Sequence, residues 1–322
     1  MREAPRDLAV TDLLAALREG WGAEAATAEF LPVGAGSHQW SVDGTWFVKV
    51  DAVRAEPAFD ALRRSLRTAL ALRRDAGLDF VLAPIPDSGG HVVRRLNPRY
   101  AMTVYPLLSG VSGEFGPHPP ADRPAVADML AALHRARPFD TPVTDLHLPG
   151  RVGLEAALRD TGRPWTAGPY AEPARQLLAG HAPRIAGWLA EFDRLAAVVG
   201  ADRTGWVVTH GEPHPGNFLH TDAGTFLIDW DTVRVAPPER DLWMLTAGFA
   251  EMMHEDPAGD DEAVLERYRK ATGRAVSAAG LALHRLWWVL ADLAVYVDQL
   301  RRPHGANADL AASLHYLTGY LR

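Results

Sequence analysis

The pattern of the chain changes about one third of the way along, and this change constrains the fold more than any other feature. Short β-like runs separated by turns dominate the first part, whereas helical periodicity dominates the rest. Strands followed by helices, rather than an alternation of the two, are typical of the α+β class. One β-like stretch at residues 206–229, "WVVTHGEPHPGNFLHTDAGTFLID", interrupts the helical part. We therefore expect an antiparallel sheet in a smaller N-terminal lobe and a mainly helical C-terminal lobe.

The first part carries the signals of an antiparallel sheet with one long helix. The runs "HQWSV" and "TWFVKV" are joined by Asp43-Gly44, a strong two-residue hairpin signal. A long helix is predicted over 57–76, because Pro57 suits a first helical position and Gly77 suits a helix end. A shorter helix is predicted over 7–19. Further strands are expected at "AEFLPV", "FVLAPIP", "GHVVRRL" and "RYAMTVYPLL".

Helical periodicity fills most of the second part. The predicted helices cover residues 121–137, 151–160, 171–198, 239–253, 260–272, 278–300 and 307–320. The Gly/Pro-rich stretch 109–120 is expected to be a loop. We place the boundary beside it, so that residues 1–106 form the first lobe and residues 107–322 the second.

Composition excludes several classes of protein. The 322 residues include no cysteine, which excludes disulfides, thiolate zinc sites and cysteine nucleophiles. The N-terminal "MREAPRDLAV" lacks the apolar run of a secretion signal. The run "LWWVLADLAVYV" is short and carries Asp292, so a buried helix is expected rather than a membrane span. The net charge of −7 without a basic stripe argues against nucleic acid and is compatible with a cationic small-molecule partner. We expect a cytoplasmic monomer or weak dimer with no membrane or nucleic-acid partner.

The motif "HGEPHPGN" contains two histidines with a carboxylate between them, which raises the question of a zinc site. A helical zinc motif places Glu directly after the first His and keeps both His on one helix face. Here Glu212 is two residues after His210, and Pro213, Pro215 and Gly216 are incompatible with a helix. Zinc is therefore disfavoured.

A second interpretation of the motif is phosphoryl transfer. That chemistry needs a carboxylate that positions the attacking hydroxyl, and oxygen ligands for the magnesium ion that neutralises the phosphates. Glu212 and Asn217 supply one of each within a single loop, and the run "GTFLID" ends on Asp229. Single Asp and Asn residues are common in loops, but the ordered set with His210 is hard to obtain by chance.

Lysine usage points to one further residue. Of the 33 basic residues, only Lys49 and Lys270 are lysine. A lysine that persists against such a bias is a candidate for a role that the planar arginine side chain does not fill. Lys270 lies in polar "ERYRKATGR" and is expected on the surface, whereas Lys49 lies in a predicted strand.

The stretch "VVTHGEPHPGNFLHTDAGTFLIDWDTVRVAPPERDLWML" resembles the catalytic signature of aminoglycoside phosphotransferases and related antibiotic kinases. Its "IDWDT" and "APPERDLW" segments are most similar to the spectinomycin-kinase-like branch. The resemblance implies a bilobal protein-kinase-like fold. It makes Glu212 the catalytic carboxylate, Asn217 and Asp229 the Mg²⁺ ligands, His210 a brace for the loop, and Asp241 a hydrogen-bond acceptor that holds the loop from a helix start.

The resemblance also implies a site for ATP or GTP in the first lobe. Lys49 would pair with the phosphates and with an acid from the long helix, for which Asp60 is favoured over Glu56. The loop "PVGAGSHQW" would cover the nucleotide, although it lacks the third glycine of the usual pattern. A hinge at 104–108 would meet the purine. The residues expected to bind the cofactor are Lys49, Gly34, Gly36, Ser37, Asp60, Tyr105 and Leu107.

Glu212 departs from the family, which has Asp at this position. Both acids are ionised at neutral pH, so the difference is geometric: Glu is one methylene longer. A misplacement of about 1 Å can cost on the order of 100-fold in rate. Either the loop accommodates the longer side chain in an active kinase, which we favour, or the protein is a pseudokinase that binds nucleotide as a sensor or scaffold.

The acceptor pocket is expected among the C-terminal helices. Trp287 and Trp288 could stack on a sugar-like or cationic acceptor, but at helical spacing a place in the core is favoured for either one. Asp231 is a candidate acceptor or metal group, and a solvated turn residue is an equal alternative.

Together these features predict a magnesium-dependent small-molecule kinase. It would move the γ-phosphoryl group of ATP or GTP to a hydroxyl of an antibiotic-like acceptor, namely an aminoglycoside, aminocyclitol, nucleoside or peptide antibiotic, and so confer resistance. A metabolic kinase acting on a sugar, amino alcohol or nucleoside is the alternative within the same enzyme class.

Overall fold

The N-terminal part is built around an antiparallel sheet. The computed structural model describes residues 4–5, 7–34, 36–137 and 139–322, so Ala35 of the expected glycine loop lies outside it. In this part of the chain the strand order is β1-β2-β3-β5-β4. The strands are β1 (Ala28–Leu31), β2 (Ser37–Val42), β3 (Trp46–Ala52), β4 (Arg94–Arg95) and β5 (Tyr100–Pro106). Asp43, Gly44 and Thr45 join β2 to β3, with φ values of 47° and 62° at the first two, so the hairpin forms where it is predicted, with a loop of three residues instead of two.

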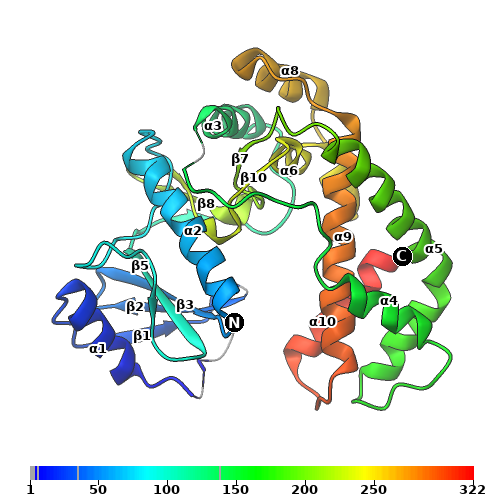
Figure 1. The fold of residues 1–322 in the computed structure, drawn as a ribbon, viewed down its shortest axis with the longest axis horizontal. Coiled ribbons are helices and arrows are strands. Elements are labelled where there is room, and N and C mark those ends of the chain that lie inside the picture. The colour runs from blue at the N-terminus through cyan, green and yellow to red at the C-terminus, as the bar shows by residue number, and fades with distance from the viewer. Residues whose placement is uncertain (1–3, 6, 35, 138) are drawn as a thin grey trace.

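Two helices pack against opposite faces of this sheet. Helix α1 (Val10–Trp21) buries Leu13 and Leu17 against the face that carries Val48. Helix α2 (Glu56–Arg74) lies across the other face and extends from the sheet toward β8 (Figure 1). Because side chains alternate along a strand, Lys49 points to the α2 side.

The segment 80–96 forms less sheet than its sequence predicts. Residues 80–86 make only an isolated parallel bridge, Val81 to Leu227, and the run 90–96 contributes only β4. Pro84 and Pro86 cannot donate backbone hydrogen bonds, which explains why no full strand forms. The bridge nevertheless ties the N-terminal part to the end of β9, two residues before Asp229.

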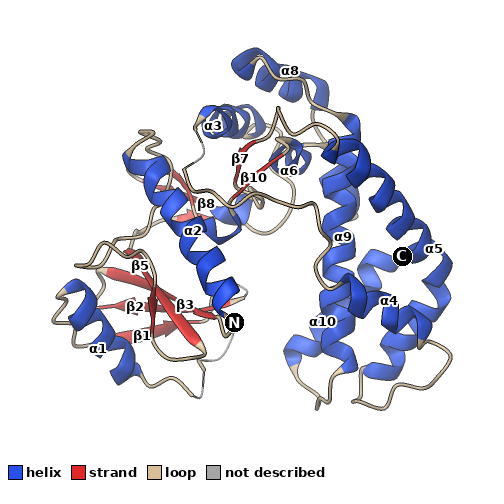
Figure 2. Cartoon of the chain, viewed as in Figure 1, coloured by secondary structure: helices blue, strands red, loops and turns tan. Residues whose placement is uncertain are grey.

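The C-terminal part is helical around short β elements (Figure 2). Strands β7 (Val207–Thr209) and β10 (Arg234–Ala236) pair with each other, and β6 (Val111–Ser112), β8 (Phe218–Thr221) and β9 (Gly224–Leu227) form a separate small sheet. The helices are α3 (Arg123–Arg135), α4 (Arg151–Arg159), α5 (Ala171–Gly200), α6 (Glu239–Leu242), α7 (Ala247–Met252), α8 (Asp261–Thr272), α9 (Ala278–Arg301) and α10 (Ala308–Leu321). The expected loop 109–120 thus contains β6.

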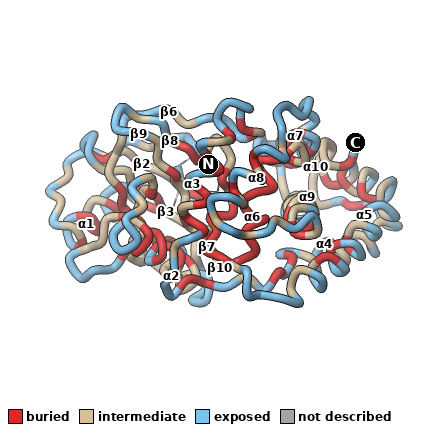
Figure 3. Tube along the Cα trace, turned by 90° about the horizontal axis from the view of Figure 1, so that it is seen from above, coloured by how far each residue is buried: buried red, intermediate tan, exposed pale blue. Residues whose placement is uncertain are grey.

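The predicted helix 239–253 is divided into α6, a 3-10 turn at Trp243–Leu245, and α7. Thr246 causes the break, since it is extended (φ −105°, ψ 162°) and its hydroxyl donates to the Trp243 carbonyl oxygen at 2.7 Å. Such local side-chain bonds compete with helical ones. Buried segments run through the middle of the molecule around β7, β10 and α6 (Figure 3).

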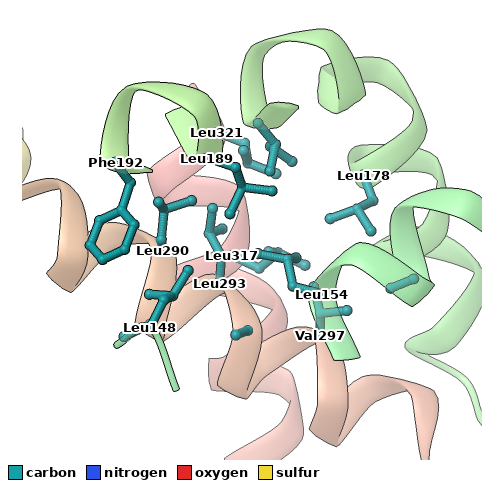
Figure 4. Close-up of a cluster of buried hydrophobic side chains, with 14 of the residues drawn as sticks. Leu148, Leu154, Leu178, Leu189, Phe192, Leu290, Leu293, Val297, Leu317 and Leu321 are labelled. Atoms are coloured by element: carbon teal, nitrogen blue, oxygen red, sulfur yellow. The ribbon is translucent and has the colours of Figure 1, made fainter. Parts of the chain in front are cut away.

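Helix α9 organises the largest apolar cluster. By length and composition alone it could cross a membrane, with a mean hydropathy of 1.3 over the best window. Its apolar side chains instead pack against α4, α5 and α10, and Figure 4 shows Leu290, Leu293 and Val297 among them. This packing matches the buried helix expected from the sequence.

Candidate active site

A buried carboxylate accepts hydrogen bonds from the backbone of the loop after β7. Asp241, in α6, accepts hydrogen bonds from the backbone N–H of His210 at 2.8 Å and of Gly211 at 2.6 Å. His134 of α3 donates to the same carboxylate through Nε2 at 3.0 Å. The Tyr268 hydroxyl donates to Nδ1 of the His134 ring at 2.8 Å. Burial opposes the charge on Asp241, but His134 and the nearby Arg240 outweigh it, and the pKa of Asp241 lies below its usual value.

Replacing Asp241 with Ala should destabilise the fold by about 3 kcal/mol or more, because it leaves the buried N–H groups of His210 and Gly211 without acceptors. Urea unfolding measures this change as a lower transition midpoint. Asp256→Ala is the matched control, since Asp256 is exposed. A loss below about 1 kcal/mol for Asp241→Ala would contradict the assigned role.

His210 braces the loop from within. Its Nε2 donates to the carbonyl oxygen of Ile228 at 2.8 Å, and its Nδ1 accepts from the N–H of Glu212 at 3.2 Å. Burial lowers the pKa of His210, which favours the neutral ring that this pattern requires. Both ring nitrogens therefore have partners in the protein.

Gly211 and Arg240 bring the loop against the segment that follows Asp229. Gly211 has φ 105°, and a Cβ at this position would lie 2.2 Å from Arg240 Nη2, so no other residue fits. The Arg240 guanidinium donates to Thr209 Oγ1 and to the Thr232 carbonyl oxygen, each at 2.9 Å. Arg240 was not among the expected site residues. Only its place one residue before Asp241 could have suggested it.

Asn217 and Asp229 lie next to each other because the backbone links their segments. The Ile228 N–H donates to the Asn217 carbonyl oxygen at 2.9 Å. The Asn217 amide donates through Nδ2 to the Glu212 carbonyl oxygen at 2.8 Å, which leaves Oδ1 for another partner. Asp229 has the left-handed backbone, φ 67° and ψ 63°, that non-glycine residues rarely adopt.

This pair of oxygen donors fits a magnesium ion. Mg²⁺ binds one or two protein oxygens and keeps its remaining ligands for water and substrate phosphates. Asn217 Oδ1 and the Asp229 carboxylate are such donors, and both residues line the same cavity. Among the described residues no group of three or more His, Asp or Glu side chains has the geometry of a metal site.

Lys49 is surrounded by acids of the sheet and of the segment after β9. Its Nζ donates to Asp229 Oδ1 and, at 2.9 Å, to Asp231 Oδ2, and it lies 4.0 Å from Asp51 Oδ1. Burial opposes the charge on Lys49, but these carboxylates raise its pKa well above the usual value. A phosphate could take the place of a carboxylate at this ammonium group.

The expected partnership of Lys49 with the long helix is wrong in this structure. Asp60 pairs with Arg63 one turn along α2, at 2.9 Å, and Glu56 pairs with Arg95 at 2.8 Å. The local i,i+3 pair competes successfully for Asp60 at the helix surface. Asp51 is the acid that sequence reasoning missed. Its position two residues after Lys49, on the same strand face, was the available signal.

Glu212 carries a carboxylate that no described residue hydrogen-bonds. Burial and the negative charges of Asp231 and Asp229 raise its pKa to about 7. A carboxylate with such a pKa is suited to take up a proton near neutral pH.

The site residues meet in a cavity of about 1120 Å³ between the sheet and the C-terminal helices. The expected residues on its wall are Gly34, Lys49, Tyr105, Leu107, Glu212, Asn217, Asp229 and Trp288. A pocket of this size holds more than one small ligand. The positive φ of Gly34, 66°, is one that glycine adopts without strain.

Besides Asp60, four of the expected binding residues do not line this cavity, although one of them, Asp231, contacts Lys49. Asp231 and Trp287 line a second cavity of about 370 Å³, where Trp287 donates to the His147 carbonyl oxygen at 2.9 Å. Ser37 is only 1% exposed, and its hydroxyl accepts from Gln39. Gly36 has φ 82° but does not line the main cavity. The Leu107 N–H is bonded to the Thr45 carbonyl oxygen at 2.9 Å, so this hinge donor is already occupied.

Comparison with known proteins bears on the fold and the family. Protein StrN of Streptomyces griseus is 28% identical over 306 residues, covering 91% of this chain and 86% of StrN. The crystal structure of the spectinomycin phosphotransferase APH(9)-Ia with ADP and spectinomycin is 17% identical, covers 97% of this chain and 94% of its own, and superposes with a TM-score of 0.76. Choline kinase LicA from Streptococcus pneumoniae is 16% identical, with coverages of 97% and 98% and a TM-score of 0.54. The expected α+β kinase-like fold is confirmed.

The model of the phosphotransferase enzyme family matches residues 27–287, which include the sheet, Lys49, the loop after β7 and Asp229. The family resemblance noted in the sequence is thereby confirmed. The chain belongs to the phosphotransferase enzyme family.

Proposed function

We propose that this protein is a small-molecule kinase that moves the γ-phosphoryl group of ATP or GTP to a hydroxyl of its acceptor. One observation carries the proposal: Lys49, Asn217, Asp229 and Glu212 line a single cavity. These are the types of group that phosphoryl transfer requires, namely a cation for the phosphates, oxygen ligands for a metal, and a free carboxylate.

The two ends of the cavity have different chemistry. Gly34, Phe47 and Tyr105 line the cavity with Lys49 at the sheet end, which suits a purine nucleotide. Asn217 and Asp229 would hold Mg²⁺, and when bound this ion neutralises phosphate charge. Lys49 would exchange one of its carboxylates for a phosphate oxygen.

Glu212 would act on the acceptor hydroxyl. The hydroxyl oxygen attacks the γ-phosphorus, its proton passes to the Glu212 carboxylate, and the bond to the β-phosphate oxygen breaks to release the nucleoside diphosphate. Asp241 and His210 hold the backbone of the loop that carries Glu212 in place. The absence of an ion pair at Glu212, among the described residues, leaves its carboxylate available for this step.

We further propose an antibiotic-like acceptor, a lobe boundary between residues 106 and 107, and a cytoplasmic monomer or weak dimer. The similarity of fold to a spectinomycin phosphotransferase supports the acceptor class. An aminopropanol kinase with a TM-score of 0.61 favours the metabolic alternative, an amino alcohol acceptor. The end of β5 at Pro106 supports the boundary.

The proposal is tested by incubating the protein with ATP or GTP, Mg²⁺ and a panel of antibiotics and amino alcohols. Release of nucleoside diphosphate together with an acceptor heavier by one phosphoryl group would support it. Tight nucleotide binding without transfer to any acceptor, and without slow hydrolysis, would favour the pseudokinase instead. Expression in a sensitive bacterium then separates resistance from metabolism, since only the former raises drug tolerance.

The pH profile should report Glu212. Its raised pKa of about 7 means that the active, ionised form is lost as the pH falls through this value. We expect kcat/KM for the acceptor to fall tenfold per pH unit on the acid side. The midpoint should lie at about 7 or lower, because a bound cation favours the carboxylate. Measurements from pH 5 to 8.5 check this. An acid limb of the same midpoint in Glu212→Gln would assign it to another group.

A further inference from the structure

The end of the main cavity away from the sheet is an aromatic chamber. We define it by the residues Phe115, Met252, Trp288, Asp292, Tyr296 and Tyr320, which line the cavity together with the catalytic loop. They come from α7, α9, α10 and the segment after β6. The chamber is therefore where an acceptor would lie if the nucleotide occupies the sheet end.

Rings form a continuous wall from the catalytic loop into the chamber. The ring of Phe115 stacks on Trp288, with centroids 5.7 Å apart and planes 20° from parallel. Phe115 also contacts the His214 ring, with centroids 4.8 Å apart and planes 74° from parallel. Burial lowers the pKa of His214 to about 4, so this ring is uncharged at neutral pH. Aromatic faces attract cations and apolar surfaces.

Asp292 is the one carboxylate among the residues that define the chamber. Its Oδ2 accepts from the Tyr320 hydroxyl at 2.7 Å and from the Tyr296 hydroxyl at 3.4 Å. Its Oδ1 has no hydrogen-bond partner, and neither oxygen has a Lys or Arg partner, among the described residues. The two phenols thus fix the carboxylate, while the free oxygen is on a side chain that lines the cavity.

A carboxylate without a counter-ion in an apolar wall is unfavourable for the unliganded protein. Burial accordingly raises the pKa of Asp292, although the two tyrosines act against this. A ligand that brings a positive charge would remove the penalty. The other acids of the cavity wall belong to the phosphate end, where Asp229 is paired with Lys49 and Glu212 is assigned to the acceptor hydroxyl.

We propose that Asp292 anchors a single ammonium group of the acceptor, and that the acceptor, whether antibiotic-like or an amino alcohol, carries one cationic amine beside an apolar surface. This inference rests on the proposed kinase function and narrows its acceptor class away from polycations. A second ammonium group would find no second carboxylate among the residues of the chamber. Trp288 and Phe115 would contact the apolar part of the acceptor.

Matched acceptors test the charge requirement. Choline and 1-amino-2-propanol each carry one cation and a hydroxyl, the N-acetyl derivative of the second is neutral, and kanamycin is a polycation. We expect kcat/KM for the cationic amino alcohols to exceed that for the neutral derivative by at least about tenfold, because only the cations pair a positive charge with the Asp292 carboxylate. Equal turnover of the neutral derivative, or best turnover of kanamycin, would overturn the proposal.

Two variants on the same helix test the residue. Asp292→Asn should raise the acceptor KM by on the order of 10- to 100-fold, and this rise should exceed any change in the nucleotide KM. Asp298→Asn removes the same charge from an exposed residue of α9 that pairs with Arg302. It should change neither the acceptor KM nor the nucleotide KM. Unaltered acceptor KM in Asp292→Asn, with the thermal unfolding of wild type, would overturn the assignment.

A binding experiment separates this inference from the proposed function. Tetramethylammonium is titrated into the protein while the intrinsic tryptophan fluorescence, to which Trp288 contributes, is recorded. Saturable quenching that weakens at least about tenfold in Asp292→Asn is expected. Failure of all phosphoryl transfer with this binding intact would reject the kinase function alone. Absence of saturable binding, or equal binding by Asp292→Asn, would reject the cation site.

Discussion

Replacing Glu212 with Gln should lower kcat for phosphoryl transfer by about 10²- to 10⁴-fold, the usual contribution of a positioned general base. The reason is that Glu212 is the carboxylate of the phosphate end that no cation engages, since Asp229 is paired with Lys49. The amide has nearly the same shape and still accepts a hydrogen bond, but it does not take up the proton. The acceptor KM should therefore change little. Initial rates of diphosphate release at saturating acceptor measure the effect.

The control for this experiment is Glu255→Gln, which removes an exposed carboxylate from the loop after α7. It should leave kcat within about twofold of wild type, as surface changes away from a site usually do. If Glu212→Gln retained a kcat within threefold of wild type, another group would have to receive the proton, and Glu212 would be only a structural residue of the loop.

The variant Glu212→Asp addresses the length of the side chain directly. His210 and Asp241 hold the loop at fixed hydrogen-bond distances, so the shorter carboxylate should stop about 1 Å short of the hydroxyl. A loss on the order of 100-fold in kcat is expected for such a displacement. A gain in kcat would instead mean that the loop has the geometry of an Asp enzyme and that Glu212 marks a weakened one. Circular dichroism and urea unfolding of both variants serve as the folding control.

The sequence predicts the local parts of this site well. The turn at Asp43-Gly44, the strand that carries Lys49, and the hydrogen bonds of Asp241 to the loop all follow from short patterns or from the family resemblance. Each depends on residues close together in the chain or on a motif of fixed spacing. The structure therefore places these residues near where the sequence analysis expects them.

The long-range parts are not predictable in the same way. Asp60 is expected to meet Lys49, but it finds Arg63 three residues away, and Asp51, Asp229 and Asp231 surround the ammonium group instead. The choice depends on distances between elements that periodicity does not encode. The same holds for Asp292 and Tyr320, which are 28 residues apart and meet only because α9 packs against α10.

Position also decides the roles of the two tryptophans. Neighbouring residues on a helix point in directions about 100° apart. Trp288 accordingly lines the main cavity, whereas Trp287 faces the smaller one. Periodicity shows that one of the pair must differ from the other, but the orientation of α9 relative to the sheet is needed to say which one meets the acceptor.

Exchanging Lys49 for Arg should lower kcat/KM for the nucleotide by on the order of 100-fold, although the charge is kept. Lys49 is only 8% exposed, and its compact ammonium group fits between the carboxylates of Asp51, Asp229 and Asp231. A planar guanidinium is larger and places its charge differently, and a shift of about 1 Å at such a site is costly. Lys270→Arg is the matched control at the other lysine, which is exposed and pairs with Glu266, and it should behave as wild type.

Lys49→Met separates catalysis from folding at the same position. Loss of the cation leaves three neighbouring carboxylates uncompensated, so the free energy of unfolding at pH 7 should fall by about 3 to 5 kcal/mol. Transfer should fall by at least about 10²- to 10³-fold, the usual effect of removing one electrostatic contact to the reacting group. Added Mg²⁺ should restore part of the stability, because a cation at Asp229 replaces the lost charge. If Lys49→Met without Mg²⁺ were as stable as wild type, the ion pairs around Lys49 would be contradicted. If Lys49→Arg kept the wild-type kcat/KM for the nucleotide, the requirement for a compact ammonium group would be contradicted.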